Sequence, residues 1–457
     1  MLKRLGISLL ALTILLLICI PTVSAIPKIT VGVNVVLNTS ITREILADLG
    51  RYGTVRDIVS EIRSLTMVAR PDKLDSIRAL PYVSAANPDA DRSGAPVDTV
   101  LVTNFANGLN TWNLDAVNVT TGPYYNNRQV GYDGTGVYVA VLDTGLLDSW
   151  RQYFPQERIA VEYARCFGGG GADVGRVAEQ PMKWEHDQNS HGTHVTSTII
   201  GYQFGVPIDG VTPLAKIIPV KVLNQNGHGW SSVIARGIVY VADLKAGPLA
   251  GYPVIINMSL GGPALDATEK AAIDYAISKG VIIVASAGNQ GTAGMDYPGA
   301  YSPVISVAAS GWVGSWPPGD PGWYYNADVA DPTNPQDFCI PDFSARQLAG
   351  QDLDVAAPGA WIVGPYQFNS GKISYYYLNG TSMASPHVAG IVALMAQKYP
   401  ALTAAQAETI LESSAVPLPP GCRTVRDGNG TAFEFCWGAD ATGAGLTTAD
   451  GALVATP

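Results

Sequence analysis

Short runs rich in valine and isoleucine recur after residue 130, and they constrain the fold more than any other feature. The runs cover Gly136–Leu142, Ile217–Val222, Val254–Met258, Val281–Ala285 and Val304–Val307. They lack a clear alternation of polar and apolar residues, as is typical of strands buried on both faces. Segments with helical spacing accompany them at His191–Ile200, Ser231–Lys245, Ala267–Lys279, Ser382–Lys398 and Ala404–Glu412. This order predicts an α/β fold with one parallel central sheet flanked by helices on both faces.

The first 25 residues have the layout of a secretory signal peptide. Lys3 and Arg4 come first, an uncharged run extends from Leu5 to Ile20, and small residues end the segment at Ala25. Sixteen uncharged residues are short for a membrane span. We therefore expect cleavage after Ala25 and a secreted, extracellular protein, with an uncleaved N-terminal anchor as the alternative.

Residues 26–92 predict a separate, small α+β unit. The expected strands and helices alternate along it, at Ile29–Leu37 (strand), Ile41–Leu49 (helix), Ser64–Arg70 (strand), Pro71–Leu80 (helix) and Tyr82–Ser84 (extended). A unit of this length is near the minimum size for independent folding. The segment Asn87–Gly94 that follows is rich in Asn, Pro, Asp and Gly, and we expect it to be an exposed, cleavable linker.

The composition suits a secreted globular protein with a large core. Of 457 residues, 47% are hydrophobic and only 14% are charged. From Ser93 onward the chain carries 17 Lys and Arg against 30 Asp and Glu. So acidic a surface argues against nucleic acid, and against anionic membrane surfaces, as partners.

Four cysteines remain once the signal peptide is removed, which leaves three possible pairings. Cys422 and Cys436 flank a loop of Gly, Asn and Asp residues that predicts a hairpin, so we expect a disulfide between them. Cys166 and Cys339 would then pair by default.

Side chains suited to catalysis stand at the ends of the predicted elements. Asp143 ends a core strand, His191 and His194 begin a helix, and Ser382 lies at a turn-to-helix junction. Residues that follow parallel strands meet in one crevice. There, an imidazole oriented by a carboxylate can remove the proton of a serine hydroxyl and make it a nucleophile. Taken singly, Ser382 would suit a helix cap and Asp143 a turn residue.

Three segments in this order carry a resemblance to a known family: Val141–Gly145, His191–Val195 and Gly380–His387. The sequence resembles the subtilisin-like (subtilase) serine proteases. The resemblance implies that Asp143, His191 and Ser382 form the catalytic triad. We assign the other two histidines in these motifs, His194 and His387, to structural roles.

The resemblance also implies an oxyanion-binding residue and two substrate-binding edges. Asn289, in the segment Ala285–Gly291, would donate its side-chain amide to the oxyanion; a turn residue is the alternative. One edge contains Ser259, Leu260 and Gly261, and the other lies at Gly227–Trp230 and includes Gly229. An extended peptide would add as a strand between these edges.

Asp296 stands where the family has part of the floor of the S1 pocket. We hypothesise that it favours Lys or Arg at P1, with a solvent-facing Asp296 as the alternative. The unit at 26–92 resembles an inhibitory propeptide, and its end places Arg92 where the self-cleaved residue would lie. The expected domains are therefore the signal peptide (1–25), the propeptide (26–92) and a subtilisin-like catalytic domain (93–457).

These features predict a secreted serine endopeptidase that is made as a self-processed zymogen. We expect it to act as a monomer on protein or peptide substrates, with its own propeptide as intramolecular inhibitor. No cofactor is expected for catalysis and no membrane contact after removal of the signal peptide. The alternatives are a catalytically silent binding or assembly protein and a different serine hydrolase, although the nucleophile segment lacks the Gly-x-Ser-x-Gly pattern of esterases.

Structural calcium is possible but is not assigned to residues. The stretch Tyr202–Ile208 lacks the Asn-rich loop that forms a calcium site in many subtilisins. An insertion at Gly311–Asp342 carries five aspartates, which suit either calcium or a solvated loop stapled by Cys339.

Overall fold

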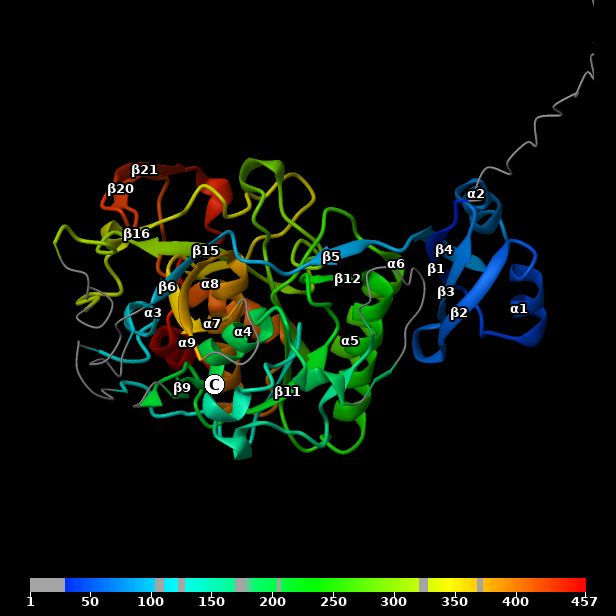
Figure 1. The fold of residues 1–457 in the computed structure, drawn as a ribbon, viewed down its shortest axis with the longest axis horizontal. Coiled ribbons are helices and arrows are strands. Elements are labelled where there is room, and N and C mark those ends of the chain that lie inside the picture. The colour runs from blue at the N-terminus through cyan, green and yellow to red at the C-terminus, as the bar shows by residue number, and fades with distance from the viewer. Residues whose placement is uncertain are drawn as a thin grey trace, which may run out of the picture.

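The computed structural model describes residues 29–102, 111–121, 128–168, 179–180, 182–203, 207–319, 328–367 and 373–457. The predicted signal peptide lies outside these residues. Figure 1 shows a small N-terminal unit, in blue, beside a much larger body. No helix within the described ranges is long and apolar enough to cross a membrane.

The small unit is a four-stranded antiparallel sheet in the order β2-β3-β1-β4, with two helices. Its elements are β1 (Val31–Leu37), α1 (Arg43–Leu49), β2 (Gly53–Val59), β3 (Ser64–Ala69), α2 (Leu74–Arg78) and β4 (Val83–Pro88). The sequence predicted all of these except β2. That strand lies at the sheet edge and is only partly buried, so its apolar pattern is weak.

The large body contains an eight-stranded sheet, ordered β16-β15-β14-β13-β7-β11-β8 with β17 also paired to β15. Its strands are β7 (Tyr138–Asp143), β8 (Arg165–Cys166), β11 (Lys216–Lys221), β13 (Val254–Met258), β14 (Val281–Ser286), β15 (Ile305–Trp312), β16 (Phe338–Cys339) and β17 (Val355–Pro358). All pairs are parallel except β15 with β16. The predicted parallel sheet is confirmed.

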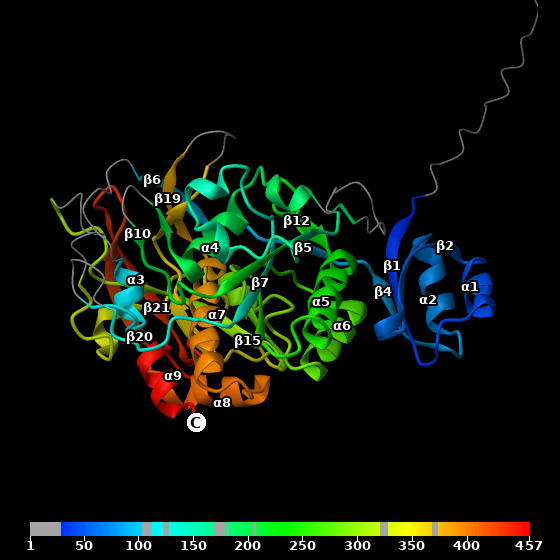
Figure 2. The ribbon, with the colours of Figure 1, turned by 90° about the horizontal axis from the view of Figure 1, so that it is seen from below.

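Helices cover both faces of this sheet (Figure 2). The helices of the large body are α3 (Trp112–Ala116), α4 (His191–Ile200), α5 (Ser231–Ala246), α6 (Ala267–Ser278), α7 (Thr381–Lys398), α8 (Ala404–Ser414) and α9 (Ala449–Ala455). Alternate residues of β7 enter two cores: Val139 belongs to the core that includes apolar residues of α4, α7 and α8, whereas Ala140 belongs to the core that includes those of α5 and α6. Because both faces are buried, the strands read as continuous apolar runs.

Two of the sequence predictions about cysteines have different outcomes. Cys422 in β20 (Gly421–Arg426) and Cys436 in β21 (Ala432–Trp437) form the expected disulfide across a hairpin. Cys166 and Cys339 are buried free thiols, so their predicted pairing is wrong. They lie in β8 and β16, the opposite edges of the central sheet. Six strand spacings of about 4.8 Å separate those edges, far beyond the reach of a disulfide.

The segment expected to be an exposed linker is instead built into the body. Residues Asp91–Ser93 form β5, which pairs antiparallel with β12 (His228–Trp230). Asp89 and Arg92 are buried. Asp89 accepts hydrogen bonds from the backbone N–H and the hydroxyl of Ser232, in the first turn of α5. Polar residues that suggested solvent exposure therefore satisfy the N-terminal amides of a helix.

Candidate active site

Asp143, His191 and Ser382 come from three elements that meet at the carboxyl ends of the strands. Asp143 is the last residue of β7, His191 the first of α4, and Ser382 lies in the first turn of α7. The Nδ1 atom of His191 lies 2.9 Å from each carboxylate oxygen of Asp143, and both side chains are buried. A carboxylate in this position holds the proton on Nδ1 and leaves Nε2 as the basic atom.

A second layer of buried polar groups positions this pair. The backbone N–H of Thr144 donates to Asp143 Oδ1 over 2.6 Å. The Thr144 hydroxyl accepts from Gly192 N–H and donates to Asp187. Burial raises the pKa of Asp187 to about 6, and the positive charge of Lys221 opposes this shift. Sequence reasoning missed Asp187, because a lone aspartate in a loop gives no signal of its own.

Close packing at the start of α4 requires glycine beside the imidazole. A Cβ at Gly192 would lie 2.5 Å from the carbonyl oxygen of Gly145, a distance that real side chains do not adopt. The preceding residue, Ser190, has φ of 79°, in the left-handed region. Its hydroxyl donates to the carbonyl of Gln367 and accepts from the Gln367 N–H, which ties this turn to the neighbouring loop. Strained backbone of this kind persists where the surrounding contacts hold it in place.

Ser382 and Ser259 exchange two hydrogen bonds. The Ser382 hydroxyl donates to the carbonyl of Ser259 over 3.2 Å, and the Ser259 hydroxyl donates to the carbonyl of Ser382 over 2.8 Å. The second bond has a backbone cause: Pro386, four residues further along α7, has no N–H to donate to Ser382 O. The Nε2 atom of His191 is buried and has no hydrogen-bond partner among the described residues. The hydroxyl is therefore held by a main-chain carbonyl, and the base retains a free acceptor.

The side chain of Asn289 is oriented by Thr381. Its Oδ1 accepts hydrogen bonds from the backbone N–H and the hydroxyl of Thr381, both over 2.9 Å. Because Oδ1 is engaged, the other side of the amide, Nδ2, is directed toward Gly380, where a Cβ would lie 3.6 Å from it. The donor thus faces the N-terminus of α7, beside the backbone N–H of Ser382. Two donors at that place suit a developing oxyanion.

The other two histidines of the motifs are structural, as the sequence predicts. His194 is buried, and its Nε2 lies 3.1 Å from the carbonyl of Ile362. Burial, with a contribution from His191, lowers its pKa to about 3. His387 bonds the carbonyl of Met383 and the side chain of Asn113, and burial lowers its pKa to about 4. Both rings stay neutral at ordinary pH.

The two predicted substrate edges lie on either side of β5. In this antiparallel arrangement Arg92 is opposite Gly229, while Ser93 is opposite both His228 and Gly261. Ser93 and Gly261 exchange both backbone hydrogen bonds, of 2.9 and 3.0 Å. A segment of the chain itself thus lies as a strand between the edges where an extended peptide was expected.

The same segment continues past His191. Gly94 N–H donates to the carbonyl of Gly227, and a Cβ on Gly94 would lie 3.2 Å from Cε1 of His191. On the far side, Val97 N–H donates to the carbonyl of Asn379, in β19 (Tyr375–Asn379), which pairs with β6 (Asp98–Val102). The peptide bonds that pass Ser382 are therefore those between Gly94 and Val97.

Arg92, expected as the self-cleaved residue, forms no ion pair with Asp296. Its guanidinium pairs instead with Glu269 of α6. Asp296 itself is 7% exposed, so the solvent-facing alternative is wrong. Its side chain packs against two glycines, since a Cβ on Gly288 would be 2.8 Å from its Oδ2 and one on Gly261 would be 2.6 Å from its Cβ. Burial raises the pKa of Asp296 to about 6, and the charge of Arg92 opposes the shift.

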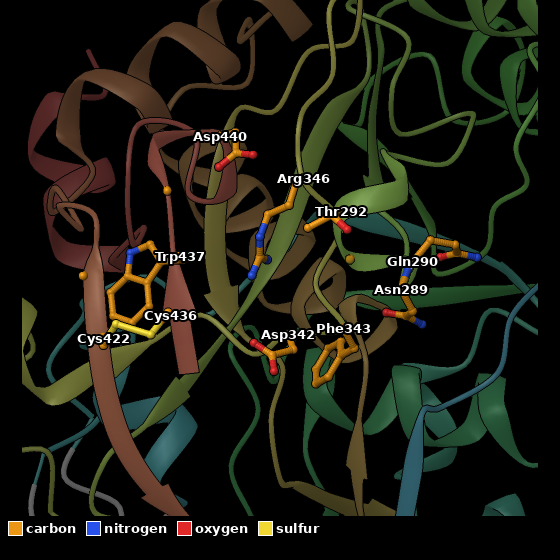
Figure 3. A pocket seen from close by; sticks show the side chains of 13 residues that line it. Asn289, Gln290, Thr292, Asp342, Phe343, Arg346, Cys422, Cys436, Trp437 and Asp440 are labelled. Carbon is orange, nitrogen blue, oxygen red and sulfur yellow. Dashed lines mark hydrogen bonds between the residues drawn. A yellow bond between two sulfur atoms is a disulfide. The ribbon is translucent and has the colours of Figure 1, made fainter. Parts of the chain in front are cut away.

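A groove of about 830 Å³ begins beside Asn289 and runs to the disulfide hairpin (Figure 3). Asn289 and Gln290 lie at one end, and Trp437 and the bond between Cys422 and Cys436 lie at the other. The sequence predicted the hairpin but not its position next to the site, because the two are separated by more than a hundred residues.

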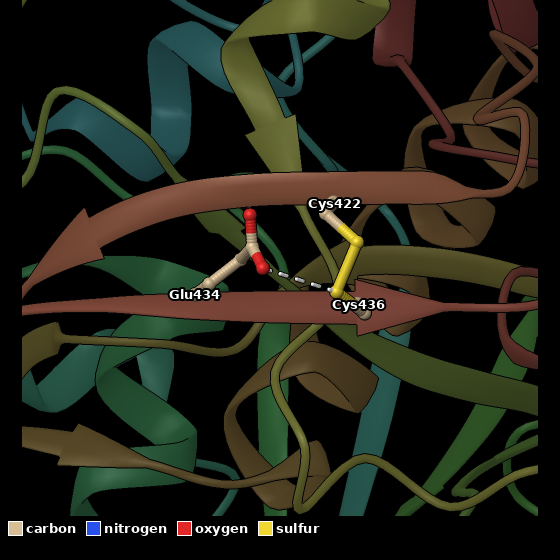
Figure 4. A group of neighbouring side chains, drawn as sticks. All are labelled: Cys422, Glu434 and Cys436. Carbon is tan, nitrogen blue, oxygen red and sulfur yellow. Dashed lines mark hydrogen bonds between the residues drawn. A yellow bond between two sulfur atoms is a disulfide. The ribbon is translucent and has the colours of Figure 1, made fainter.

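Two groups of side chains among the described residues have metal-ligand spacing. Cys422, Glu434 and Cys436 form the first, but their two sulfurs are joined in a disulfide and cannot act as thiolate ligands (Figure 4). The second is Asp352, Asp354 and Glu408. The aspartates of the predicted acidic insertion that the structure describes belong to neither group, and Cys339 does not staple that insertion because it is a free thiol.

Comparison with known proteins gives the class to which this geometry belongs. A model of the Subtilase family matches residues 134–438. Subtilisin DY of Bacillus licheniformis is 34% identical over 292 residues, covering 63% of this chain and 86% of the relative. M-protease of Shouchella clausii is 32% identical over 354 residues, covering 78% of this chain and 74% of the relative.

A solved structure shares the fold over most of the chain. Fervidolysin from Fervidobacterium pennivorans, described as a keratinolytic enzyme related to subtilisin, matches with a TM-score of 0.65 at 24% identity. The match covers 93% of this chain but 61% of fervidolysin. The architecture is therefore subtilisin-like. The chain belongs to the Subtilase family and is a serine endopeptidase. No comparison supports a catalytically silent binding or assembly protein.

Proposed function

We propose that the protein is a secreted endopeptidase, made as a zymogen, in which Asp143, His191 and Ser382 cut the peptide bond. Nε2 of His191 accepts the Ser382 proton as Oγ attacks the scissile carbonyl, and the imidazolium that forms is stabilised by Asp143. His191 then gives the proton to the leaving amine, and water hydrolyses the acyl-enzyme by the same route. As in other subtilases, no cofactor takes part in these steps.

Asn289 Nδ2 and the Ser382 N–H stabilise the oxyanion of the tetrahedral intermediate. The support for this role is the hydrogen bonding of Thr381 to Asn289 Oδ1, which fixes the orientation of the amide before any substrate binds. Donors held in place in this way need no reorganisation during the reaction.

The zymogen form is supported by the course of the chain through the cleft. The backbone pairs with Gly261 on one side of Ser382 and with Asn379 on the other, with no break between them. A bound substrate would need the same backbone partners, so the segment that includes β5 blocks access until it is cut. We propose that self-processing cleaves between Gly94 and Val97, and that the released N-terminal unit is the inhibitory propeptide.

N-terminal sequencing of the active enzyme tests this register. We expect the mature chain to begin at Ala95, Pro96 or Val97. A start at Ser93 would instead support cleavage after Arg92, and a start well beyond Val100 would contradict both sites. Labelling by a fluorophosphonate, lost in Ser382→Ala, tests the nucleophile independently of processing.

Asp296 is proposed to favour Lys or Arg at P1. The supporting observation is a carboxyl that lies at the cleft wall beneath Gly261 and Gly288 and forms no ion pair with any residue that the structure describes. A cationic side chain of the substrate would then supply its partner. A peptide library that is cleaved after Phe or Leu in preference to Arg would contradict this role.

A structural cation, most simply calcium, is proposed at Asp352, Asp354 and Glu408. Their carboxylate oxygens lie within 4.8 Å of one another, and Asp354 Oδ1 is buried with no hydrogen-bond partner among the described residues. Burial raises the pKa of Asp354 to about 7, and the negative charges of Glu408 and Asp352 contribute to this shift. A bound cation would relieve this repulsion. We expect EGTA to lower the melting temperature of the wild type but not that of Asp354→Asn. An equal effect of EGTA on the two proteins would contradict a cation at this site.

A further inference from the structure

Arg92 of β5 is held in a fully enclosed acidic pocket. Its side chain and that of Glu269 are both 0% exposed. The Arg92 Nε atom donates to both oxygens of Glu269, over 3.1 and 3.2 Å, and Nη2 donates to Glu269 Oε2 over 2.5 Å and to the carbonyl of Ala264 over 2.9 Å. Such fork-shaped pairing is specific to a guanidinium.

The pocket is built by the enzyme body and not by the segment that fills it. Glu269 lies in the first turn of α6, where its backbone N–H donates to the helix cap Asp266. Gly262 forms the wall, since a Cβ there would lie 2.9 Å from Arg92 Nη1. Removing β5 would leave Glu269, Asp266 and the Ala264 carbonyl in place. Acceptors and negative charge would then dominate the pocket.

The position of Arg92 is one that a substrate side chain would take. Arg92 is opposite Gly229 and is followed by Ser93, which pairs with Gly261, and then by Gly94 beside His191. A substrate bound between the same edges has its corresponding residue over Glu269. Along the extended chain, Arg92 and Gly94 face the protein, whereas the side chain between them is exposed.

An empty pocket would leave the Glu269 carboxylate without its cation. Burial raises the pKa of Glu269, and the charge of Arg92 opposes that shift. Leaving one member of a buried charged pair unpaired is unfavourable, so a ligand that restores the partner gains affinity relative to a neutral one.

We propose that Glu269 is a specificity-determining residue that selects substrates with arginine at the position of Arg92, two residues before the one that lies beside His191. This inference rests on the proposed function, because it assumes that substrates replace β5 in the same register. The substrate class is therefore proteins with an extended segment in which an arginine precedes the cleavage site at this fixed distance.

The test uses the mature wild-type enzyme and three quenched fluorescent peptides. The first has the sequence of residues 87–98 with serine in place of Pro96, so that an X–Pro bond does not limit cleavage. The second replaces its arginine by citrulline, a neutral isostere. The third exchanges the arginine with the following serine, which moves the charge by one residue. Mass spectrometry identifies the bond that is cut in each.

We expect kcat/KM for the arginine peptide to exceed that for the citrulline and the shifted peptide by about 30-fold or more. In Glu269→Gln, the kcat/KM values for the three peptides should differ by less than about threefold. The preference for the arginine peptide should persist in Asp274→Asn, which removes an exposed charge on the same helix. Should Glu269→Gln fail to fold, the three peptides on the wild type still test the preference for arginine at this position.

Equal cleavage of the arginine and citrulline peptides by the wild type would overturn the inference and leave the proposed function intact. An equal gain from the shifted arginine would also overturn it, because attraction to an acidic surface would then explain the preference. If no peptide and no casein is cut, and a fluorophosphonate does not label Ser382, the proposed function fails and the inference fails with it.

Discussion

Two acidic pockets border β5, and they differ in what they hold. Glu269 is paired through both oxygens with Arg92 and is closed from solvent. Asp296 lies nearby against the cleft wall, but no ion pair of the described residues includes it. Arg92 of β5 thus forms an ion pair with one of these carboxyl groups, whereas none of the described residues forms an ion pair with the other.

The difference separates two uses of a buried charge. In the Glu269 pocket, the pair helps to hold the N-terminal unit on the enzyme body. In the Asp296 pocket, burial raises the pKa to about 6, so the carboxyl loses its proton only near neutral pH. The first pocket should therefore govern both docking and selectivity, and the second should govern selectivity alone.

Replacing Ser382, the proposed nucleophile, should have the largest effect. The chain should then stay uncut, so that the surroundings of Glu269 and Asp296 do not change. In subtilisin, removal of the triad serine lowers kcat by about 10⁶-fold. We expect a loss of this order in Ser382→Ala, together with a purified chain that keeps its N-terminal unit by mass spectrometry. Ser413→Ala, at the exposed end of α8, should mature like the wild type. Processing of Ser382→Ala at the wild-type rate would contradict self-cleavage.

Asn289→Ala should slow the chemistry without touching either pocket. Loss of one oxyanion donor typically lowers kcat by about 10²–10³-fold. We expect a fall in kcat with little change in KM, and unchanged ratios between the arginine and citrulline peptides. Because Asn289 also bonds Thr381, the melting temperature should be measured alongside. A rise in KM with kcat preserved would mean that Asn289 binds substrate and does not stabilise the oxyanion.

Arg92→Ala should remove the ion pair with Glu269. Removing one member of a buried ion pair costs about 3–5 kcal/mol. In the uncut Ser382→Ala background we expect denaturant unfolding to show a loss of this size in the free energy that holds the N-terminal unit. The matched control is Arg51→Ala, whose pair with Asp48 is largely exposed and worth less than about 1 kcal/mol. Equal effects of the two substitutions would remove the distinction between the pockets.

The Asp296 pocket should respond to pH. Above its pKa of about 6 the carboxylate attracts a basic P1 side chain, and below it the neutral acid does not. The ratio of kcat/KM for P1 Arg to that for P1 Leu should therefore fall by about tenfold as the pH drops from 7.5 to 5, whereas protonation of His191 cancels in the ratio. In Asp296→Asn the ratio should be low and independent of pH. A ratio that does not change with pH in the wild type would contradict the role of Asp296.

Local patterns in the sequence predicted the fold, and three motifs predicted the candidate triad. The Val/Ile runs match β7, β11, β13, β14 and β15, because buried parallel strands must be apolar on both faces. Asp143, His191 and Ser382 were assigned from the motifs that resemble the subtilases, and the structure places them in three elements that meet at the carboxyl ends of the strands.

Other features had no local signal. Asp266 and Glu269 are spaced as an N-cap and its N3 partner, so the sequence favours an ordinary helix cap at the residue that in fact pairs with Arg92. Cys166 and Cys339 were paired only because two cysteines remained, and sheet order places them at opposite edges. The polar composition of Asn87–Gly94 indicated exposure, although Asp89 and Arg92 find buried partners in α5 and α6.

The sequence by itself determined which elements form, since periodicity and helix boundaries depend on near neighbours. Its motifs also marked the three residues that we propose as the triad. Only the tertiary structure decided that residues 91–97 run past His191 and Ser382, that Arg92 pairs with Glu269, and that Asp296 is buried without an ion pair among the described residues. Pairing between segments more than a hundred residues apart, such as Arg92 with Glu269, depends on backbone register and on the requirement that a buried charge find a partner.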